Sequence, residues 1–309
     1  MRTRLSSTAC VIVALSACTA ATSAYVGDVR PPDDGTPVLC APSVISTGDV
    51  FASTFTPDGR TVVFTKAAPG RPLTLLQSHW RDSRWSAPET LPFSGTHRDL
   101  DPAFAPDGSR LYFSSRRPKG PSPADTTSLD DTWYVDRVEG GWGPPVRAAG
   151  AVNSAAVDMY PSVTRRGTLY FDSSRSRRRM AYRADAAPGG GWAEPVLLDV
   201  AINGDSGSSN LFVDPDERYA VFASRRAGGH GDADLHISWR TETGWSAALN
   251  LGATINTPAT EFCPFVSHDG RYLFFTRAVA RQGAPPSRDI YVVRFDAVLR
   301  RVGQPPRTG

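Results

Sequence analysis

Short apolar runs recur along the chain, and most of them follow a tight turn. Residues 56–64, TPDGRTVVF, place a Pro-Asp-Gly turn before β-branched and aromatic residues, and residues 105–113, APDGSRLYF, repeat this 49 positions later. Proline presets φ, aspartate can bond its own backbone and glycine accepts positive φ, so the triplet favours a turn between two strands. The pattern predicts β-hairpins rather than helices.

This unit occurs five times. Aligned on the residue two positions before the turn, the copies are spaced by 49, 59, 50 and 53 residues, at Phe55, Phe104, Val163, Val213 and Val266. After each turn come a second strand, a loop of variable length and a third strand. A fourth strand opens with tryptophan in four copies, at Trp85, Trp142, Trp192 and Trp245. Four short strands per fifty residues are typical of one propeller blade, so the sequence predicts an all-β, five-bladed β-propeller of four-stranded antiparallel blades over residues 38–300.

The fifth copy lacks a tryptophan-led strand after Phe295, so its sheet would be incomplete. Residues 38–46, VLCAPSVIS, precede the first blade as similar segments precede the later ones. We expect this segment to supply the missing outer strand, the alternative being an unpaired N-terminal extension. Because the tryptophans recur at one position in the blades, we expect them to pack in the core rather than to stack on sugars.

The N-terminus predicts export. Two arginines precede an apolar run at residues 9–17 that is too short to span a bilayer, which is typical of a signal peptide, here residues 1–17. The residues Leu-Ser-Ala-Cys at 15–18 resemble the lipobox of bacterial lipoproteins, and this resemblance implies lipidation of Cys18. Ordinary cleavage after Ala24 is the alternative. Residues 18–37 are predicted to form a flexible tether that packs on nothing, and residues 301–309 a disordered tail.

The repeat resembles a known family. An acidic residue, then Pro-x-Phe-x-Pro-Asp-Gly, an apolar strand and Asp-Ile-Tyr are similar to the WD-repeat-like β-propeller repeat of the TolB type. The resemblance covers about residues 38–300 and is weakest in the third copy, where Arg165-Arg166-Gly167 replaces the turn. Residues 19–37 are too short for the separate partner-docking domain of TolB, so no role in that translocation system is implied.

Composition narrows the function classes. A formal net charge of +3 is too small to indicate a nucleic-acid partner, and 40% hydrophobic residues are enough for a sizeable core. The chain has no nucleotide-binding glycine loop, no Cys-x-x-Cys and no Ser-His-Asp motif, so we expect no cofactor. Residues 230–234, HGDAD, could hold a metal ion, but such loops occur in this repeat without one, and we assign no metal.

Irregular segments are expected to gather on one face of the ring, at residues 118–130, 227–234 and 278–288. Variable loops on a rigid scaffold are the usual place for a binding site, so this loop-rich mouth is the default site. Three acids stand five residues before the alignment position of their copies and could converge in the central channel: Asp99, Asp158 and Glu261. They are candidates for ligand binding or for glycoside hydrolysis, unless they only bond neighbouring backbone.

A cation follows the second strand of every copy, at Lys66, Arg116, Arg175, Arg225 and Arg277. Three copies also begin the third strand with an acid, at Asp131, Asp234 and Asp289. Arginine–carboxylate pairs within each blade explain this pattern; the alternative is a basic ring that attracts an anionic ligand.

Cys40 and Cys263 remain after export. The closure model puts them on the outer and inner strands of one blade, about 14 Å apart, which is too far for a disulfide. We therefore expect two buried free thiols, with a disulfide as the alternative if the closure differs.

Together these patterns favour an exported, monomeric, non-enzymatic β-propeller, held at the bacterial outer membrane or cell surface through Cys18, that binds an envelope protein or glycan. A secreted or periplasmic location stays open. The alternatives are an envelope glycan hydrolase or lyase that uses Asp99, Asp158 and Glu261, and a purely structural envelope component.

Overall fold

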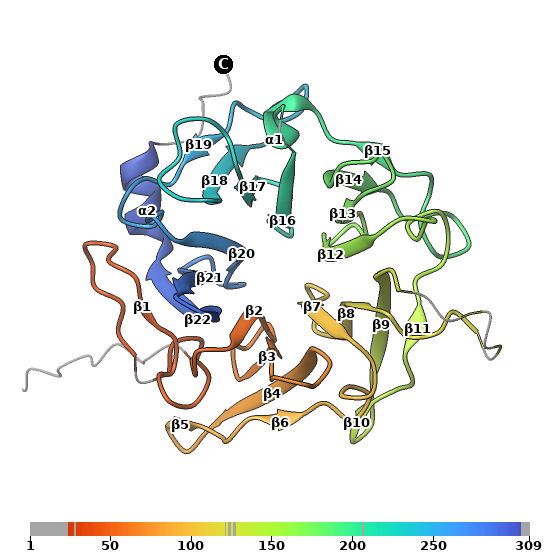
Figure 1. Cartoon of the computed structure of the whole chain (residues 1–309). Coiled ribbons are helices and arrows are strands. Elements are labelled where there is room, and N and C mark those ends of the chain that lie inside the picture. Colours follow the sequence, from red (N-terminus) through yellow and green to blue (C-terminus); the bar gives the residue numbers. More distant parts are fainter. Residues whose placement is uncertain are drawn as a thin grey trace, which may run out of the picture.

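Five antiparallel sheets surround a central axis in the computed structural model (Figure 1). The structure describes residues 24–27, 29–120, 122, 125, 128–205 and 207–303. Each sheet is one blade, and its first strand lies nearest the axis. The predicted five-bladed β-propeller with four-stranded antiparallel blades is confirmed. The signal peptide, Cys18 and residues 304–309 lie outside the described residues.

The first three blades follow one another along the chain. Blade one contains β2 (Val50–Phe55), β3 (Thr61–Lys66), β4 (Thr74–Arg81), β5 (Arg84–Trp85) and β6 (Glu89–Thr90). Blade two contains β7 (Asp99–Phe104), β8 (Arg110–Ser115), β9 (Asp131–Val138), β10 (Gly141–Trp142) and β11 (Val146–Arg147). Blade three contains β12 (Asp158–Val163), β13 (Leu169–Ser173), β14 (Met180–Ala184) and β15 (Val196–Leu197).

The last two blades close the ring. Blade four contains β16 (Ser208–Val213), β17 (Tyr219–Ser224), β18 (Asp234–Trp239) and β19 (Leu249–Asn250), preceded by the short helix α1 (Val200–Asn203). Blade five contains β20 (Thr260–Val266), β21 (Tyr272–Arg281), β22 (Ala284–Arg294) and the N-terminal strand β1 (Val38–Leu39). Helix α2 (Phe295–Val302) follows β22 on the outside of the ring.

The N-terminal strand completes the last blade, as the sequence predicts. Val38 pairs with Val292 and Leu39 with Tyr291, and the Cys40 N–H donates to the Ile290 carbonyl at 2.9 Å. A sheet edge that would expose unpaired backbone groups is thereby covered. Because the segment that precedes the first blade is a strand of the last sheet, the two ends of the propeller cannot separate without breaking backbone hydrogen bonds.

A phenylalanine in the second strand of every blade forms the core between neighbouring sheets. The five rings are at most 1% exposed: Phe64, Phe113, Phe171, Phe222 and Phe275. Three of the blade tryptophans, Trp85, Trp192 and Trp245, are also buried, which confirms their predicted core role, whereas Trp142 is half-buried beside Phe104. The two remaining cysteines, Cys40 and Cys263, form no disulfide and are buried, as expected.

Residues 24–27 and 29–37 differ from the prediction. Tyr25 and Val26 are 4% and 3% exposed, and the Tyr25 hydroxyl donates to the Pro57 carbonyl at 2.7 Å. The Tyr25 ring also lies 5.6 Å from the Phe55 ring. The expectation that this segment packs on nothing is wrong, because one tyrosine finds an apolar site among the first-to-second-strand turns. That site is on the face opposite the mouth.

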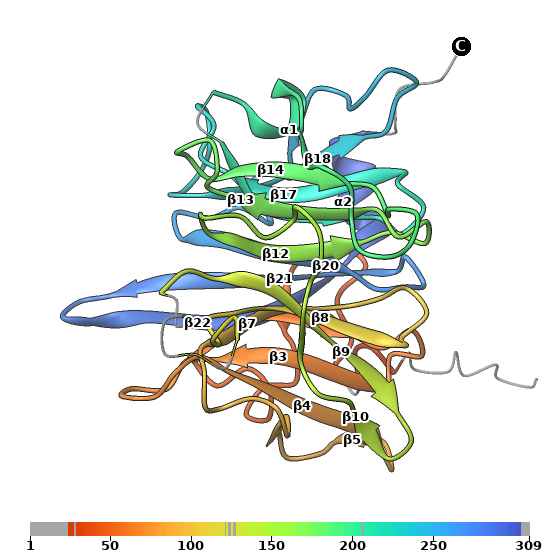
Figure 2. The same ribbon diagram turned by 90° about the vertical axis from the view of Figure 1, so that its right-hand side faces the viewer.

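Two further expectations need correction. Arg301 and Val302 belong to α2 rather than to a disordered tail. Residues 278–288 are not a loop but the end of a β-hairpin formed by β21 and β22, which projects beyond the ring (Figure 2). The two prolines in this stretch are tolerated because the projecting hairpin has no further strand to bond. Among the described residues, neither helix is long and apolar enough to cross a membrane.

Candidate functional site

Every innermost strand carries a β-bulge at the same place. The bulge residue has positive φ in all five blades: Ala52, Asp101, Tyr160, Asn210 and Cys263. The strand register shifts across each of these positions. A non-glycine residue in this conformation is unfavourable by about 1 kcal/mol or more. Its occurrence at the equivalent position of all five blades therefore shows that the bulge is a regular feature of the fold. The bulges set the wall of the central channel.

A side chain from the second strand of one blade bonds the bulge of the next. Hydroxyl oxygens of Thr276, Thr65 and Ser114 accept the bulge N–H groups of Ala52, Asp101 and Tyr160 at 3.1, 3.2 and 3.0 Å. In blade three the acceptor is the carboxylate of Asp172, 2.8 Å from the Asn210 N–H. In blade four the position is Ala223, whose methyl group accepts nothing. Only one blade therefore uses a carboxylate where a hydroxyl is sufficient.

The three predicted acids are fixed within their own blades. Asp99 is 0% exposed and accepts from Arg117, Ser115 and Ser94 at 2.8, 2.6 and 2.8 Å. Arg117 also donates to the Phe93 carbonyl at 3.2 Å. The arginine thus ties the start of the inner strand to the link before it.

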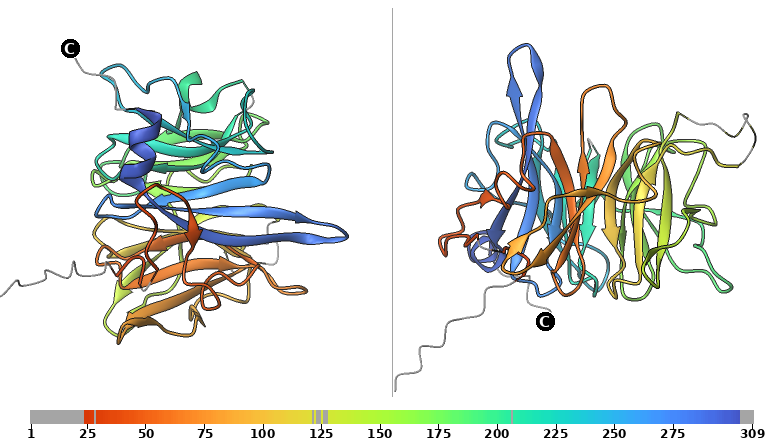
Figure 3. Two further views of the ribbon diagram at one scale, coloured as in Figure 1. Left: turned by 90° about the vertical axis from the view of Figure 1, so that its left-hand side faces the viewer. Right: turned by 90° about the horizontal axis from the view of Figure 1, so that it is seen from below.

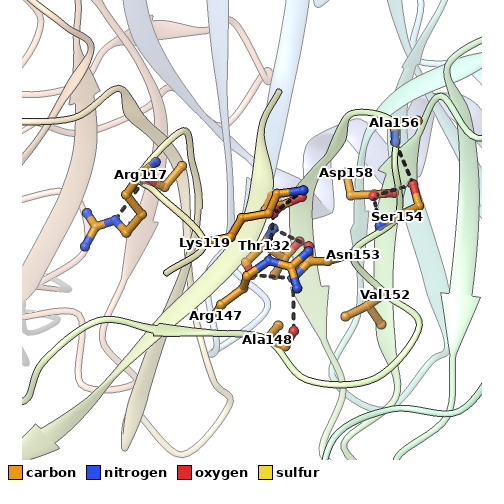
Figure 4. Close-up of polar contacts among 12 residues, drawn as sticks. Arg117, Lys119, Thr132, Arg147, Ala148, Val152, Asn153, Ser154, Ala156 and Asp158 are labelled. Atoms are coloured by element: carbon orange, nitrogen blue, oxygen red, sulfur yellow. Dashed lines mark hydrogen bonds and ion pairs between the residues drawn. The ribbon is translucent and has the colours of Figure 1, made fainter. Parts of the chain in front are cut away.

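Asp158 and Glu261 repeat this arrangement. Asp158 accepts from Arg175 at 3.0 Å and from Ser154. Asn153, in the link that precedes Asp158, donates to a backbone carbonyl of blade two (Figure 4). Glu261 accepts from Arg277 at 2.7 Å and from Thr257. Neither they nor Asp99 line the mouth cavity described below. These contacts favour the structural interpretation of the three acids over a convergent channel site.

The predicted cations have acidic partners, but not the expected ones. Arg116 pairs with Asp130 at 3.2 Å and Arg225 with Asp232 at 2.8 Å, instead of Asp131 and Asp234. Arg277 pairs with Glu261 rather than Asp289, and Lys66 with Asp49. The register explains the difference: Arg116 and Arg225 reach the loop before the third strand, whereas Lys66 and Arg277 reach toward the first strand of their own blades.

A cavity of about 450 Å³ opens at the loop-rich end of the channel. This is the end where the β21–β22 hairpin rises (Figure 3). Phe51, Phe262 and Met159 line its apolar part, and the polar lining includes Arg98, Arg179, Arg225, Arg288 and Asp101. We call this space the mouth cavity. Its volume lies within the roughly 300 to 1,000 Å³ of small-molecule sites.

Below the mouth cavity the channel narrows to a space of about 40 Å³. Asp101 lines both spaces and Tyr160 lines the narrow one, where its hydroxyl donates to the Pro264 carbonyl at 3.1 Å. Burial raises the pKa of the Tyr160 hydroxyl and of the Cys263 thiol, so both groups are neutral. The constriction makes the mouth cavity a pocket with a floor rather than an open pore.

Two buried carboxylates, Asp101 at this floor and Asp172 on β13, lack complete hydrogen bonding. Asp101 is 3% exposed and its Oδ2 has no hydrogen-bond partner among the described residues; the same holds for Oδ1 of the fully buried Asp172. Burial raises the pKa of Asp101 to about 7, against the opposing charges of Arg179 and Arg98. Burial also raises the pKa of Asp172 to about 7, again opposed by Arg179. Strongly raised pKa values in a cleft are typical of functional sites.

Sequence reasoning missed both residues because it searched for acids that recur. The available signal was the opposite one, because both residues are exceptions in the repeat. The other blades have Ala, Tyr, Asn or Cys at the position of Asp101, and Ser, Thr or Ala at the position of Asp172. The structure also adds Arg179 and Arg288 to the predicted cations. Among the groups of His, Cys, Asp and Glu in the described residues, none is arranged to hold a metal ion.

No family model and no curated protein matches this chain. Among solved structures it is similar to a putative TolB from Agrobacterium tumefaciens, with a TM-score of 0.53 and 16% identity over 81% of this chain and 79% of that one. TolB from Acinetobacter baumannii gives a TM-score of 0.50 and 16% identity over 80% of this chain; the chain spans 54% of that protein's length. An α-L-arabinofuranosidase from Podospora anserina, solved with cellotriose, gives a TM-score of 0.51 and 11% identity over 83% and 93% of the two chains. Identities this low show a shared propeller fold alone.

Proposed function

We propose that this protein is a lipid-anchored, non-enzymatic binding module of the bacterial cell envelope that holds a protein or glycan partner at the loop-rich mouth of its propeller. The observation that carries the proposal is the mouth cavity of about 450 Å³, with an apolar wall, an arginine-rich rim and a buried carboxylate at its floor. A large pocket with a few converging polar groups is the usual form of a binding site. The protein acts as a monomer, without cofactor or nucleic acid.

The location follows from the proposed lipidation of Cys18. Tyr25 docks on the face opposite the mouth, and seven residues span at most about 25 Å. An anchor at Cys18 would therefore hold the tight-turn face toward the outer membrane or cell surface and leave the mouth open to a partner. If the chain is cleaved without lipidation, the same propeller is secreted or periplasmic.

Glycan hydrolysis is the second candidate function. The observation in its favour is the pair of carboxyl groups Asp101 and Asp172, whose pKa values are raised to about 7, as an acid–base catalyst requires. Asp172 does not line the mouth cavity, which favours binding over catalysis. Release of reducing sugar from a bound glycan, lost in Asp101→Asn, would instead assign the enzyme function.

Localisation is tested by replacing Cys18 with Ser. The variant should lose metabolic palmitate labelling and membrane retention, because it has no thiol for the lipid at that position. A variant that fractionates with membranes as the wild type does contradicts the anchored form of the proposal.

Binding at the mouth is tested by filling it. Ala278 lines the mouth cavity and is half-buried, whereas Ala87 is exposed beside an outer strand. We expect Ala278→Trp to abolish binding of any ligand that a glycan array or an envelope-protein pull-down finds, while Ala87→Trp binds as the wild type does. Equal binding by both variants would place the site elsewhere.

A further inference from the structure

The arginines of the mouth cavity fall into two classes. Arg98 and Arg225 are neutralised by ion pairs with Asp130 and Asp232. Arg179 and Arg288 form no ion pair with any carboxylate of the described residues, although both line the cavity. A guanidinium group binds carboxylates through a planar fork of N–H donors. Two such groups are therefore available to a ligand that carries an anionic group.

Both arginines are oriented by apolar neighbours. The Arg288 guanidinium lies over the Phe51 ring at 5.9 Å from its centre, and Arg179 lies against the sulfur of Met159. These contacts hold the side chains along the cavity wall without neutralising their charge. Preorganised donors lose less entropy when a ligand binds.

The floor requires a different ligand group. Asp101 Oδ2 is buried and has no donor among the described residues, and leaving a buried polar atom unsatisfied is unfavourable. A ligand hydroxyl could supply the missing hydrogen bond. Between floor and rim, the Phe51 and Phe262 rings lie 6.2 Å apart and form an apolar wall, against which the C–H face of a sugar ring can pack.

We propose that the mouth cavity binds an acidic saccharide, with the uronate carboxylate held by Arg179 and Arg288 and the ring hydroxyls donating to Asp101. This inference rests on the proposed function, which makes the mouth cavity the binding site, and it names the ligand class. A neutral sugar would leave the two arginines without a counter-charge. A free phosphate would leave Asp101 unsatisfied and would meet its negative charge.

Asp172 acts as a positioning residue. Its carboxylate lies behind the cavity wall, bonds the Asn210 N–H and shares the field of Arg179 with Asp101. Three other blades make the equivalent backbone bond with a hydroxyl. The carboxylate is therefore unnecessary for that backbone bond, and its charge interacts with that of Arg179.

The experiment is calorimetric titration of the full chain in its Cys18→Ser form. The probes are a panel of uronic acid oligosaccharides, neutral oligosaccharides of the same linkages, and inorganic phosphate. We expect a uronate probe to bind at least about tenfold more tightly than its neutral counterpart and than phosphate. Equal affinity for the neutral counterpart would refute the acidic-saccharide inference and leave the mouth as a glycan site. Preference for phosphate, or no binding of any uronate at millimolar concentration, also refutes it.

Single substitutions test the role of each cavity residue in binding. Arg179→Gln and Arg288→Gln should each weaken uronate binding about tenfold or more and reduce its salt dependence, while neutral-sugar binding stays unchanged. Asp101→Asn places the residue of blade four at the same bulge, so the fold is kept and the affinity for both sugars falls. Arg84→Gln, at an exposed position of β5, is the charge-matched control and should bind within twofold of the wild type. Unchanged binding by both cavity arginine variants contradicts the proposal, whatever their stability.

The Asp172→Ser variant distinguishes an effect of Asp172 through Arg179 from a direct contact between Asp172 and the ligand. We expect it to weaken uronate binding severalfold while the affinity for the neutral counterpart stays constant, because it acts through Arg179. In the Arg179→Gln background, Asp172→Ser should have no further effect. An equal loss in both backgrounds would mean that Asp172 contacts the ligand itself.

Discussion

Asp99 and Asp101 stand two residues apart on β7, and both are buried, but their surroundings differ in kind. At the first residue of β7, Asp99 accepts hydrogen bonds from one arginine and two serines. At the channel wall, Asp101 has an oxygen without any donor in the described part of the chain and a pKa raised to about 7 by burial. The fold satisfies the hydrogen bonds of the first carboxylate, but the described residues do not satisfy those of the second.

The same contrast separates the two acids of blade three. Asp158 repeats the arrangement of Asp99, with Arg175 as its partner, whereas Asp172 occupies a position where three other blades have a hydroxyl. In a repeat protein, what recurs maintains the contacts between blades, and what departs from the repeat is free to serve the ligand. Recurrence therefore identifies the scaffold here, and the exceptions identify the site.

The largest effect should come from removing a recurring acid. Asp99→Ala leaves the buried Arg117 guanidinium without its counter-charge, and breaking such a pair typically reduces stability by about 3–5 kcal/mol. Urea denaturation monitored by tryptophan fluorescence measures the change. The double variant Asp99→Ala/Arg117→Met removes both charges and should recover part of the loss. If Asp99→Ala unfolds at the wild-type midpoint, the scaffold role is wrong.

The second effect is a pH dependence from the exceptional acids. The carboxyl groups of Asp101 and Asp172 have pKa values of about 7 in the folded protein, against 3.8 as the ordinary value. Between these values the folded state binds more protons than the unfolded state, so this stabilisation is full below about pH 4 and is lost as the pH rises through about 7. We expect each of the two groups to lower the free energy of unfolding by about 2–3 kcal/mol between pH 5 and 8.

A double variant isolates this pH dependence. Arg98, Arg179 and Asp130 also face the two carboxyl groups, while Tyr160 and Cys263 remain neutral. Asp101→Asn/Asp172→Ser should have a flatter stability profile from pH 5 to 8, and buried histidines that titrate in this range contribute equally to both proteins. Parallel profiles for the two proteins would show that the two acids do not titrate as a linked, buried pair.

Most of the fold could be predicted because the residues that determine it recur at regular positions in the sequence. The turn triplets, the spacing near fifty and the missing fifth tryptophan strand together indicate five blades closed by residues 38–46, and β1 confirms it. The docking of Tyr25 could not be predicted, because a single aromatic residue in a polar segment has no periodicity. The hairpin at residues 278–288 was hidden for a related reason, since its prolines are acceptable only at an edge that the sequence does not reveal.

For the candidate site, the sequence could predict only the face of the propeller on which it lies. The variable loops correctly indicate the end of the channel where a cavity of about 450 Å³ opens. The identity of its polar groups depends on which strand-end side chain reaches which partner, and the sequence offers several acids for each cation. Arg116 illustrates this, because Asp130 and Asp131 are adjacent in the chain and only the register decides that Asp130 is the partner.

A smaller effect is expected when Asp172 is replaced by the residue that the repeat uses. Asp172→Ser keeps an acceptor for the Asn210 N–H and removes a buried charge, so at pH 8 we expect a gain of about 1–2 kcal/mol. Asp172→Ala is the matched control: it removes the charge but also the acceptor, and should be less stable than the serine variant by about 1 kcal/mol. A serine variant that is less stable than the wild type at pH 8 would make Asp172 part of the scaffold after all.

The smallest effect tests the recurring scaffold contacts at blade four, which lacks the side chain that bonds the bulge of the next blade. Ala223 is fully buried on β17, at the position where the second strands of the other blades bond the bulge of the next blade. Ala223→Ser brings a hydroxyl to the N–H of Cys263, and one added hydrogen bond should raise stability by about 1 kcal/mol. Ala220→Ser, on the same strand but facing the core with no such partner, should lower stability instead. Hydrogen exchange of the Cys263 amide gives the direct measurement, because the new bond should slow it about fivefold at that stability change. If Ala223→Ser leaves both the exchange rate and the midpoint of unfolding unchanged, the hydroxyls at this position do not hold the blades together, and the distinction between Asp172 and its counterparts loses its basis.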